Sequence, residues 1–162
     1  MAYRYEEEIS VHLIAKIAYG AMLLAYVVFA LDQRAHVGLF LTFLPIVAIL
    51  IAIPLVFGRL VFEIQEEDIR IRFGYVGWPG RIVPLADVER TEVVTYRPIR
   101  QFGGWGIRGA RFQGEFTGAY SMRGNRGLLL FLTKDTRFSL FRTRRLLLGS
   151  LEPERLQQAI GR

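Results

Sequence analysis

The sequence contains no cysteine, and its basic residues are almost all arginine, because Lys16 and Lys134 are its only lysines. Without cysteine, the chain forms no disulfide and no thiolate metal site, which is compatible with a reducing compartment. The only two histidines, His12 and His36, precede residue 58, so the rest of the chain has no imidazole to act as a base for a nucleophile. We therefore expect a protein that is not an enzyme, with no catalytic residues, no metal site and no cofactor.

Long apolar runs, in contrast, are present twice, at 11–31 ("VHLIAKIAYGAMLLAYVVFAL") and at 37–57 ("VGLFLTFLPIVAILIAIPLVF"). At the rise of an α-helix, either run matches a hydrocarbon core of roughly 30 Å. The second run carries no charge, and the first carries only Lys16, near its start, where a long side chain reaches the headgroup region. The two runs predict two membrane-spanning helices.

The short connector at 32–36 ("DQRAH") predicts that the two helices form an antiparallel hairpin with both termini on one side. The segment 58–162 begins with Arg59 after its first glycine and contains 18 Lys and Arg against 11 Asp and Glu, a net charge of +7. By the positive-inside rule, both the N-terminus (1–10) and the domain at 58–162 are expected in the cytoplasm. This predicts a multi-pass protein of a bacterial cytoplasmic (inner) membrane.

Four small residues in the apolar runs form two small-xxx-small pairs, Ala21 with Ala25 and Ala48 with Ala52. Such pairs allow helices to approach closely, so we expect these alanines in helix packing, within the hairpin or against other subunits.

The two histidines are candidates for contact with a haem or a chlorophyll. His12 and His36 lie at opposite ends of the first run, so they cannot share one bis-histidine site. Interfacial hydrogen bonding is the expected role of each.

After residue 58, apolar residues recur at every second position. Ile69, Ile71 and Phe73 alternate with Arg70 and Arg72, as a half-buried strand requires. Polar or glycine-rich turns at 66–68 ("EED") and 77–80 ("GWPG") separate this strand from its neighbours, and further strands are expected at 81–88 and 90–97.

The C-terminal third predicts a hairpin of two strands, 127–133 and 136–142, joined at Lys134 and Asp135, and then a helix that begins near Pro153. The order is six or seven antiparallel strands followed by one helix. This order predicts an α+β membrane protein in which a transmembrane hairpin precedes an antiparallel β-barrel or sandwich closed by the C-terminal helix.

The segments "GGWGIRG" (103–109), "GNRGLLLFLTKDTRFSL" (124–140) and "PERLQQAI" (153–160) resemble the bacterial membrane-anchored proteins with a pleckstrin-homology-like (PH-like) domain. The resemblance covers 58–162. It implies a seven-strand barrel that is capped by a helix and serves as an interaction module. The run at 140–150 ("LFRTRRLLLGS") departs from the family by being more basic and richer in leucine.

The "GGWGIRG" segment has two compatible interpretations. Glycines allow positive φ angles, so the segment can be a tight connection between strands. Trp105 and Arg108 can also form an exposed contact with a partner or a lipid headgroup, since tryptophan and arginine are the commonest interface residues. The segment lacks the lysine and hydroxyl residue of a phosphate-binding loop.

Further arginines are candidates for contact with a partner or with anionic lipid: Arg97, Arg100, Arg142, Arg144 and Arg145. Arginine binds carboxylates and phosphates in a bidentate geometry. A simply solvated basic surface is the alternative. Nucleic-acid binding is not expected, because the basic residues do not interleave with aromatic residues on one strand face.

Together these features predict a non-enzymatic, membrane-anchored interaction protein. Its expected role is that of an accessory or scaffold subunit that stabilises a larger membrane complex, for instance a respiratory or photosynthetic one. The alternatives are a free-standing module that binds anionic lipid or a stress signal and, third, a component of an enzyme or transporter.

Overall fold

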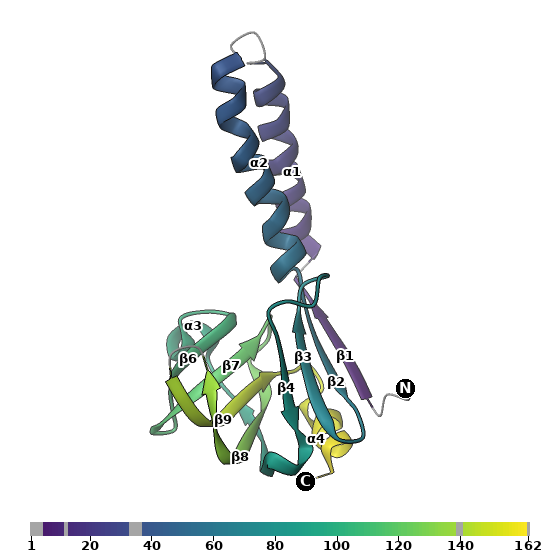
Figure 1. The fold of residues 1–162 in the computed structure, drawn as a ribbon, viewed down its shortest axis with the longest axis vertical. Coiled ribbons are helices and arrows are strands. Elements are labelled where there is room, and N and C mark those ends of the chain that lie inside the picture. Colours follow the sequence, from purple (N-terminus) through teal and green to yellow (C-terminus); the bar gives the residue numbers. More distant parts are fainter. Residues whose placement is uncertain (1–4, 12, 33–36, 139–140, 162) are drawn as a thin grey trace.

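The computed structural model describes residues 5–11, 13–32, 37–138 and 141–161, without the side chains of 14–15, 30, 37–40 and 42–44. Two β-sheets form the body of the molecule, and a pair of antiparallel helices projects from one end of it (Figure 1). The fold is therefore α+β, with more of the described residues in strands than in helices.

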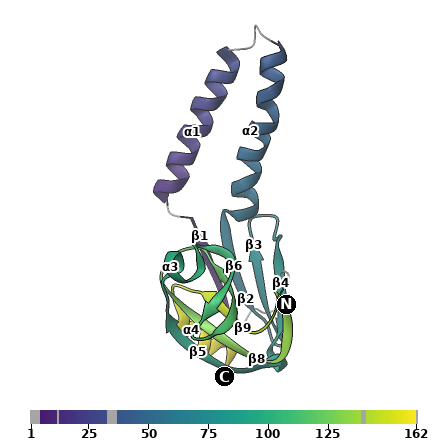
Figure 2. The same cartoon turned by 90° about the vertical axis from the view of Figure 1, so that its left-hand side faces the viewer.

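The projecting helices are α1 (Leu13–Asp32) and α2 (Val37–Phe57), at the positions that the apolar runs predict. The half-buried residues of α1 include Tyr19, Leu23 and Tyr26, and those of α2 include Val47 and Leu50. Their spacing of three or four residues places each set on one helix face, so these faces form the contact between the helices. Figure 2 shows the helices close together near their connection and further apart near the sheets.

Among the residues that the structure describes, no helix combines the length and the apolar character that a membrane crossing requires. The prediction of a transmembrane hairpin in a multi-pass inner-membrane protein is therefore corrected. The two segments form a helical hairpin, without a membrane span in the described part of the chain.

The first sheet has four antiparallel strands in the order β1 (Tyr5–Ser10), β2 (Arg59–Ile64), β3 (Asp68–Phe73) and β4 (Gly80–Pro84). Ser10 is the register partner of Arg59, so the helical hairpin is inserted between two paired strands. The N-terminal segment, treated as separate from the domain in the sequence analysis, thus contributes a strand to this sheet. Its Ile9 is fully buried in the core.

Tyr5, at the start of β1, is expected to make the free energy of unfolding depend on pH. Burial, with the charge of Glu7 as a second cause, raises the pKa of Tyr5 to about 12. The unfolded chain loses this proton near pH 10, so the contribution of Tyr5 to stability is complete below pH 10 and is lost as the pH rises toward 12. We expect the free energy of unfolding to fall less steeply over this window in Tyr5→Phe than in the wild type, measured by urea unfolding. An unchanged slope would contradict this, and Tyr75→Phe, which alters an exposed tyrosine, is the control.

The second sheet has five strands in the order β5-β8-β9-β7-β6. Their bounds are β5 Val88–Thr95, β6 Gly106–Phe112, β7 Glu115–Ser121, β8 Arg126–Phe138 and β9 Phe141–Gly149. The prediction of an entirely antiparallel barrel or sandwich is corrected at one pair, because β7 and β9 run parallel. A 3-10 turn, η2 (Leu85–Asp87), leads from the first sheet into the second.

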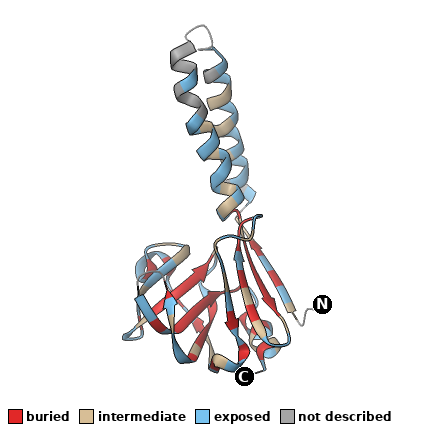
Figure 3. Cartoon of the chain, in the orientation of Figure 1, coloured by how far each residue is buried: buried red, intermediate tan, exposed pale blue. Residues whose placement is uncertain are grey.

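Leucine runs in β8 and β9 are buried on both faces of the second sheet. Leu128 and Leu130 point into the main core, between the sheets, whereas Leu129 points into a smaller core on the opposite face. In β9, Leu146 likewise points into the main core and Leu147 into the smaller core. A strand that is covered on both sides favours a continuous apolar run, which explains the unexpected leucine content of 140–150. Figure 3 shows these buried residues concentrated in the sheets.

Two short helices cover the second sheet. The first, α3 (Pro98–Phe102), places Phe102 over the smaller core, where its ring lies 5.8 Å from that of Tyr96. The second, α4 (Pro153–Ile160), is the predicted C-terminal helix, and its Leu156 and Ile160 are buried in the main core.

The predicted hairpin at Lys134 and Asp135 is wrong. The chain continues through these residues as β8, with a register irregularity between Phe131 and Thr136. The two charged side chains form ion pairs on the surface, Lys134 with Asp87 and Asp135 with Arg144. A lysine and an aspartate in sequence therefore mark an exposed, irregular part of one long strand.

Candidate partner-docking site

The glycine-rich segment at 103–106 links α3 to β6 in a conformation that side chains rarely allow. Gly103, Gly104 and Gly106 have φ angles of 72°, 126° and 110°. Gly103 also ends α3 by donating its N–H to the Ile99 carbonyl. The positive φ angles expected of these glycines are therefore confirmed, and the glycines are needed for their backbone conformation. The segment joins a helix to a strand, however, and not two strands as expected.

Trp105 is held in place by its polar edge, and its ring remains accessible. The indole N–H donates to the Gly124 carbonyl at 3.1 Å, in the turn between β7 and β8. The side chain of Arg108 donates through Nε to the Trp105 carbonyl at 3.3 Å. Trp105 is nevertheless 42% exposed. Such an arrangement orients an aromatic side chain at low conformational cost for contact with another molecule.

A cleft of about 570 Å³ brings Trp105 and Arg108 together with the base of the helical hairpin. Ile53 and Phe57 of α2 form one wall, and the segment from Trp105 to Arg108 forms another. The remaining lining residues are Phe73, Pro79 and Met122. The cleft is mostly apolar, has a volume typical of ligand and peptide pockets, and has a cationic side chain in its wall.

The apolar residues of this cleft are not recognisable from the sequence. Nothing in the local pattern separates Ile53 and Phe57 from the rest of an apolar run. Only the fold brings the end of α2 next to the start of β6.

Positive charge near the cleft is not neutralised within the described part of the chain. Arg97 and Arg100 lie at the start and in the last turn of α3, which packs against β6, and Arg108 lies on β6 itself. All three are exposed, and none has a carboxylate partner among the described residues. Of the other described arginines, eight form ion pairs: Arg59, Arg70, Arg72, Arg90, Arg126, Arg144, Arg145 and Arg155.

The candidate arginines of β9 do not form one exposed group. Arg142 and Arg144 are exposed, and Arg144 pairs with Asp135 at 2.8 Å. Arg145 points to the other face and is only 4% exposed. Its guanidinium donates to the Phe112 carbonyl and the Gln113 side chain, and lies 5.0 Å from the Phe131 ring. Arg145 therefore holds the β6–β7 turn in place and is not accessible to a partner.

The four alanines of the small-xxx-small pairs are all exposed: Ala21, Ala25, Ala48 and Ala52. They lie outside the contact between α1 and α2, which larger side chains make. Many large apolar side chains of the hairpin are exposed as well: Leu13, Ile17, Met22, Leu24, Val28, Phe29, Leu31, Leu41, Ile46, Ile49, Ile51, Ile53, Leu55 and Phe57. An apolar surface of this extent is typical of a region that contacts another molecule.

In the described part of the chain, no three His, Cys, Asp or Glu residues are placed so that they could hold a metal ion. His12 and His36 lie outside the described residues, so the roles considered for them are not addressed. The absence of enzyme activity, metal and cofactor remains a prediction.

Comparison with known proteins identifies no family. No protein-family model matches the chain, and no match was found among curated proteins or solved structures. The resemblance to PH-like domain proteins thus remains a prediction from the sequence.

Proposed function

We propose that this protein is a non-enzymatic docking subunit that binds a partner protein and stabilises a larger assembly. The observation that carries the proposal is the shared cleft, in which Trp105 and Arg108 line the same space as Ile53 and Phe57 of the hairpin. A partner that fills the cleft also lies next to the exposed apolar helices. One surface therefore extends from the second sheet onto the hairpin.

The partner segment that suits the cleft is apolar with acidic flanks. The apolar wall takes an aliphatic or aromatic side chain, and Trp105 supplies a large contact area. Arg97, Arg100 and Arg108 have no carboxylate partner among the described residues, so they are available to acidic side chains. Charge complementarity thus favours a polypeptide with Asp or Glu beside its apolar residues.

Replacing Trp105 or Arg108 with alanine is the direct test. We expect either variant to lower affinity for the partner by roughly thirtyfold, equal to about 2 kcal/mol, because a central aromatic–arginine contact is lost. The partner is first identified by co-purification with the tagged full-length chain, and its affinity for each variant is then measured by calorimetry with purified components.

Two matched variants serve as controls. Trp78→Ala removes the only other tryptophan, which is exposed and does not line the cleft. Arg142→Ala removes an exposed arginine of β9. Both should keep wild-type affinity. If Trp105→Ala keeps the partner, and the chain binds anionic liposomes with a steep dependence on salt, the proposal fails and the lipid-binding alternative replaces it.

A further inference from the structure

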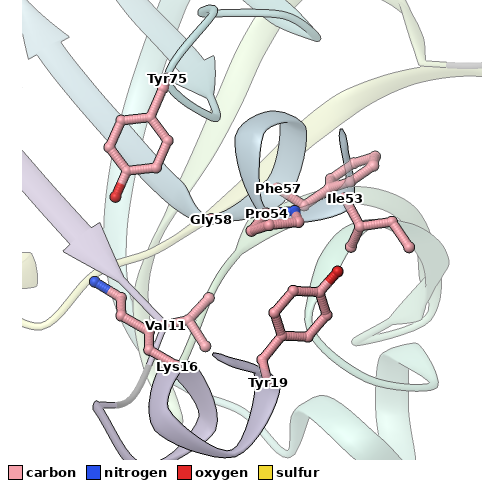
Figure 4. A pocket seen from close by; sticks show the side chains of 8 residues that line it. All are labelled: Val11, Lys16, Tyr19, Ile53, Pro54, Phe57, Gly58 and Tyr75. Carbon is pink, nitrogen blue, oxygen red and sulfur yellow. The ribbon is translucent and has the colours of Figure 1, made fainter. Parts of the chain in front are cut away.

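A second cleft lies where the two helices meet the sheets (Figure 4). Its volume is about 320 Å³, and it opens between the ends of α1 and α2 that Figure 2 shows apart. The residues that line it are Val11, Lys16, Tyr19, Ile53, Pro54, Phe57, Gly58 and Tyr75. Ile53 and Phe57 also line the cleft at Trp105 and Arg108, so the two clefts lie on either side of the base of α2.

The interior of this second cleft is apolar. Val11, Ile53, Pro54 and Phe57 supply hydrocarbon walls (Figure 4). Gly58 is buried, and a Cβ added to it would lie only 2.2 Å from the Pro54 carbonyl oxygen. The chain therefore turns from α2 into β2 at a position where only glycine fits.

Lys16, Tyr19 and Tyr75 bring polar groups to this cleft, and in Figure 4 the Tyr19 hydroxyl points toward Ile53 whereas the Lys16 ammonium points to the opposite side of the view. The Tyr19 hydroxyl oxygen is buried without a hydrogen-bond partner. Lys16 lies one helical turn before Tyr19, and thus on the same face of α1. Lys16 has no carboxylate partner among the described residues.

The charge at the mouth of the cleft is positive. The Arg59 guanidinium lies 4.9 Å from the Tyr75 ring, but it is paired with Glu8 at 3.1 Å. Lys16 is thus the uncompensated charge at this site. An apolar pocket with one free cation at its edge suits a ligand with a hydrocarbon tail and an anionic head.

We propose that this cleft binds a single-chain anionic amphiphile, with its tail between Ile53, Pro54 and Phe57 and its head at Lys16. A fatty-acid carboxylate and a lysophospholipid phosphate share this chemistry. The head-group end of the site is separate from the cleft at Trp105, because Lys16 does not line that cleft, although Ile53 and Phe57 line both clefts.

The test uses displacement of a dansyl-labelled undecanoate from the full-length chain, below the critical micelle concentration of every competitor. We expect saturable one-to-one binding and displacement by dodecanoate about tenfold more efficient than by dodecanol, because a charged head gains a charge-assisted hydrogen bond. Lysophosphatidate is the second competitor. Whichever of dodecanoate and lysophosphatidate displaces the probe more efficiently shows whether the site prefers a carboxylate or a phosphate head group. Equal displacement by dodecanoate and dodecanol would overturn the proposal.

Matched variants locate the site. Lys16→Gln should remove the preference for dodecanoate over dodecanol, whereas Lys134→Gln, at the only other lysine, should retain it. Ile53→Trp should fill the cleft and abolish probe binding, whereas Leu24→Trp, on an exposed part of α1, should not. Unchanged binding in both Lys16→Gln and Ile53→Trp would show that the amphiphile binds elsewhere. Lys16→Gln should leave partner affinity unchanged, so the two proposals can fail separately.

Discussion

Replacing Arg72 with alanine is expected to lower the free energy of unfolding by about 3 kcal/mol, because it leaves a buried carboxylate without its partner. Glu63 on β2 is only 2% exposed, and the Arg72 side chain on β3 forms an ion pair with it. Arg70, the register partner of Glu63, is paired with Asp68 instead. The Arg72 side chain is 48% exposed, so we take the lower end of the range for breaking a buried pair.

Urea unfolding of the full-length chain measures this effect. Arg70→Ala is the control, since it breaks a more exposed pair on the same strand and should cost less than about 1 kcal/mol. The double variant Glu63→Gln/Arg72→Ala should recover much of the loss, because it removes the buried charge as well. Equal stability of Arg72→Ala and Arg70→Ala would mean that Glu63 does not depend on Arg72.

A loss of about 2–3 kcal/mol is expected for Glu7→Ala, which removes the acceptor of two buried donors. Glu7 is a buried residue of β1, and its carboxylate accepts hydrogen bonds from the Ser150 hydroxyl at 2.6 Å and the Leu151 amide at 2.7 Å. Ser150 in turn accepts from the Glu152 amide at the start of α4. Glu7 thus joins the N-terminal strand to the connection between β9 and α4.

The conservative variant Glu7→Gln distinguishes the contribution of the hydrogen bonds to stability from a general disruption of the fold. Glu7→Gln keeps one acceptor oxygen and should lose roughly half as much free energy of unfolding as Glu7→Ala. Glu8→Ala, whose exposed carboxylate pairs with Arg59, should cost less than about 1 kcal/mol. If Glu7→Ala and Glu8→Ala were equally stable, the buried hydrogen bonds would not contribute measurably.

The sequence predicts elements whose periodicity is local. The alternation of Ile69, Ile71 and Phe73 corresponds to β3, the two apolar runs correspond to α1 and α2, and the stripe of Leu156 and Ile160 corresponds to α4. The glycines before Trp105 indicate positive φ angles for a local steric reason.

Features that depend on distant segments could not be predicted in this way. The acidic segment at 6–8 reads as a solvated terminus, yet Glu7 is buried by partners more than 140 residues away. Arg144 and Arg145 are neighbours in a basic run, and only the alternation of a strand between two cores separates an exposed arginine from a buried one. A long apolar run likewise predicts that a helix forms. It predicts less securely what surrounds that helix.

The pairing of Ser10 with Arg59 has a consequence for the order of folding. Strands β2, β3 and β4 are joined by short turns, so their pairing closes only small loops. Strand β1 pairs with β2 only after the whole segment 11–58 has returned to its starting point, and closing a longer loop costs more conformational entropy. The sheet therefore assembles from β2–β4 outward and receives β1 late. Until then the edge of β2 is open, and a second copy of β1 from another chain could occupy it, which is the route to a strand-exchanged dimer.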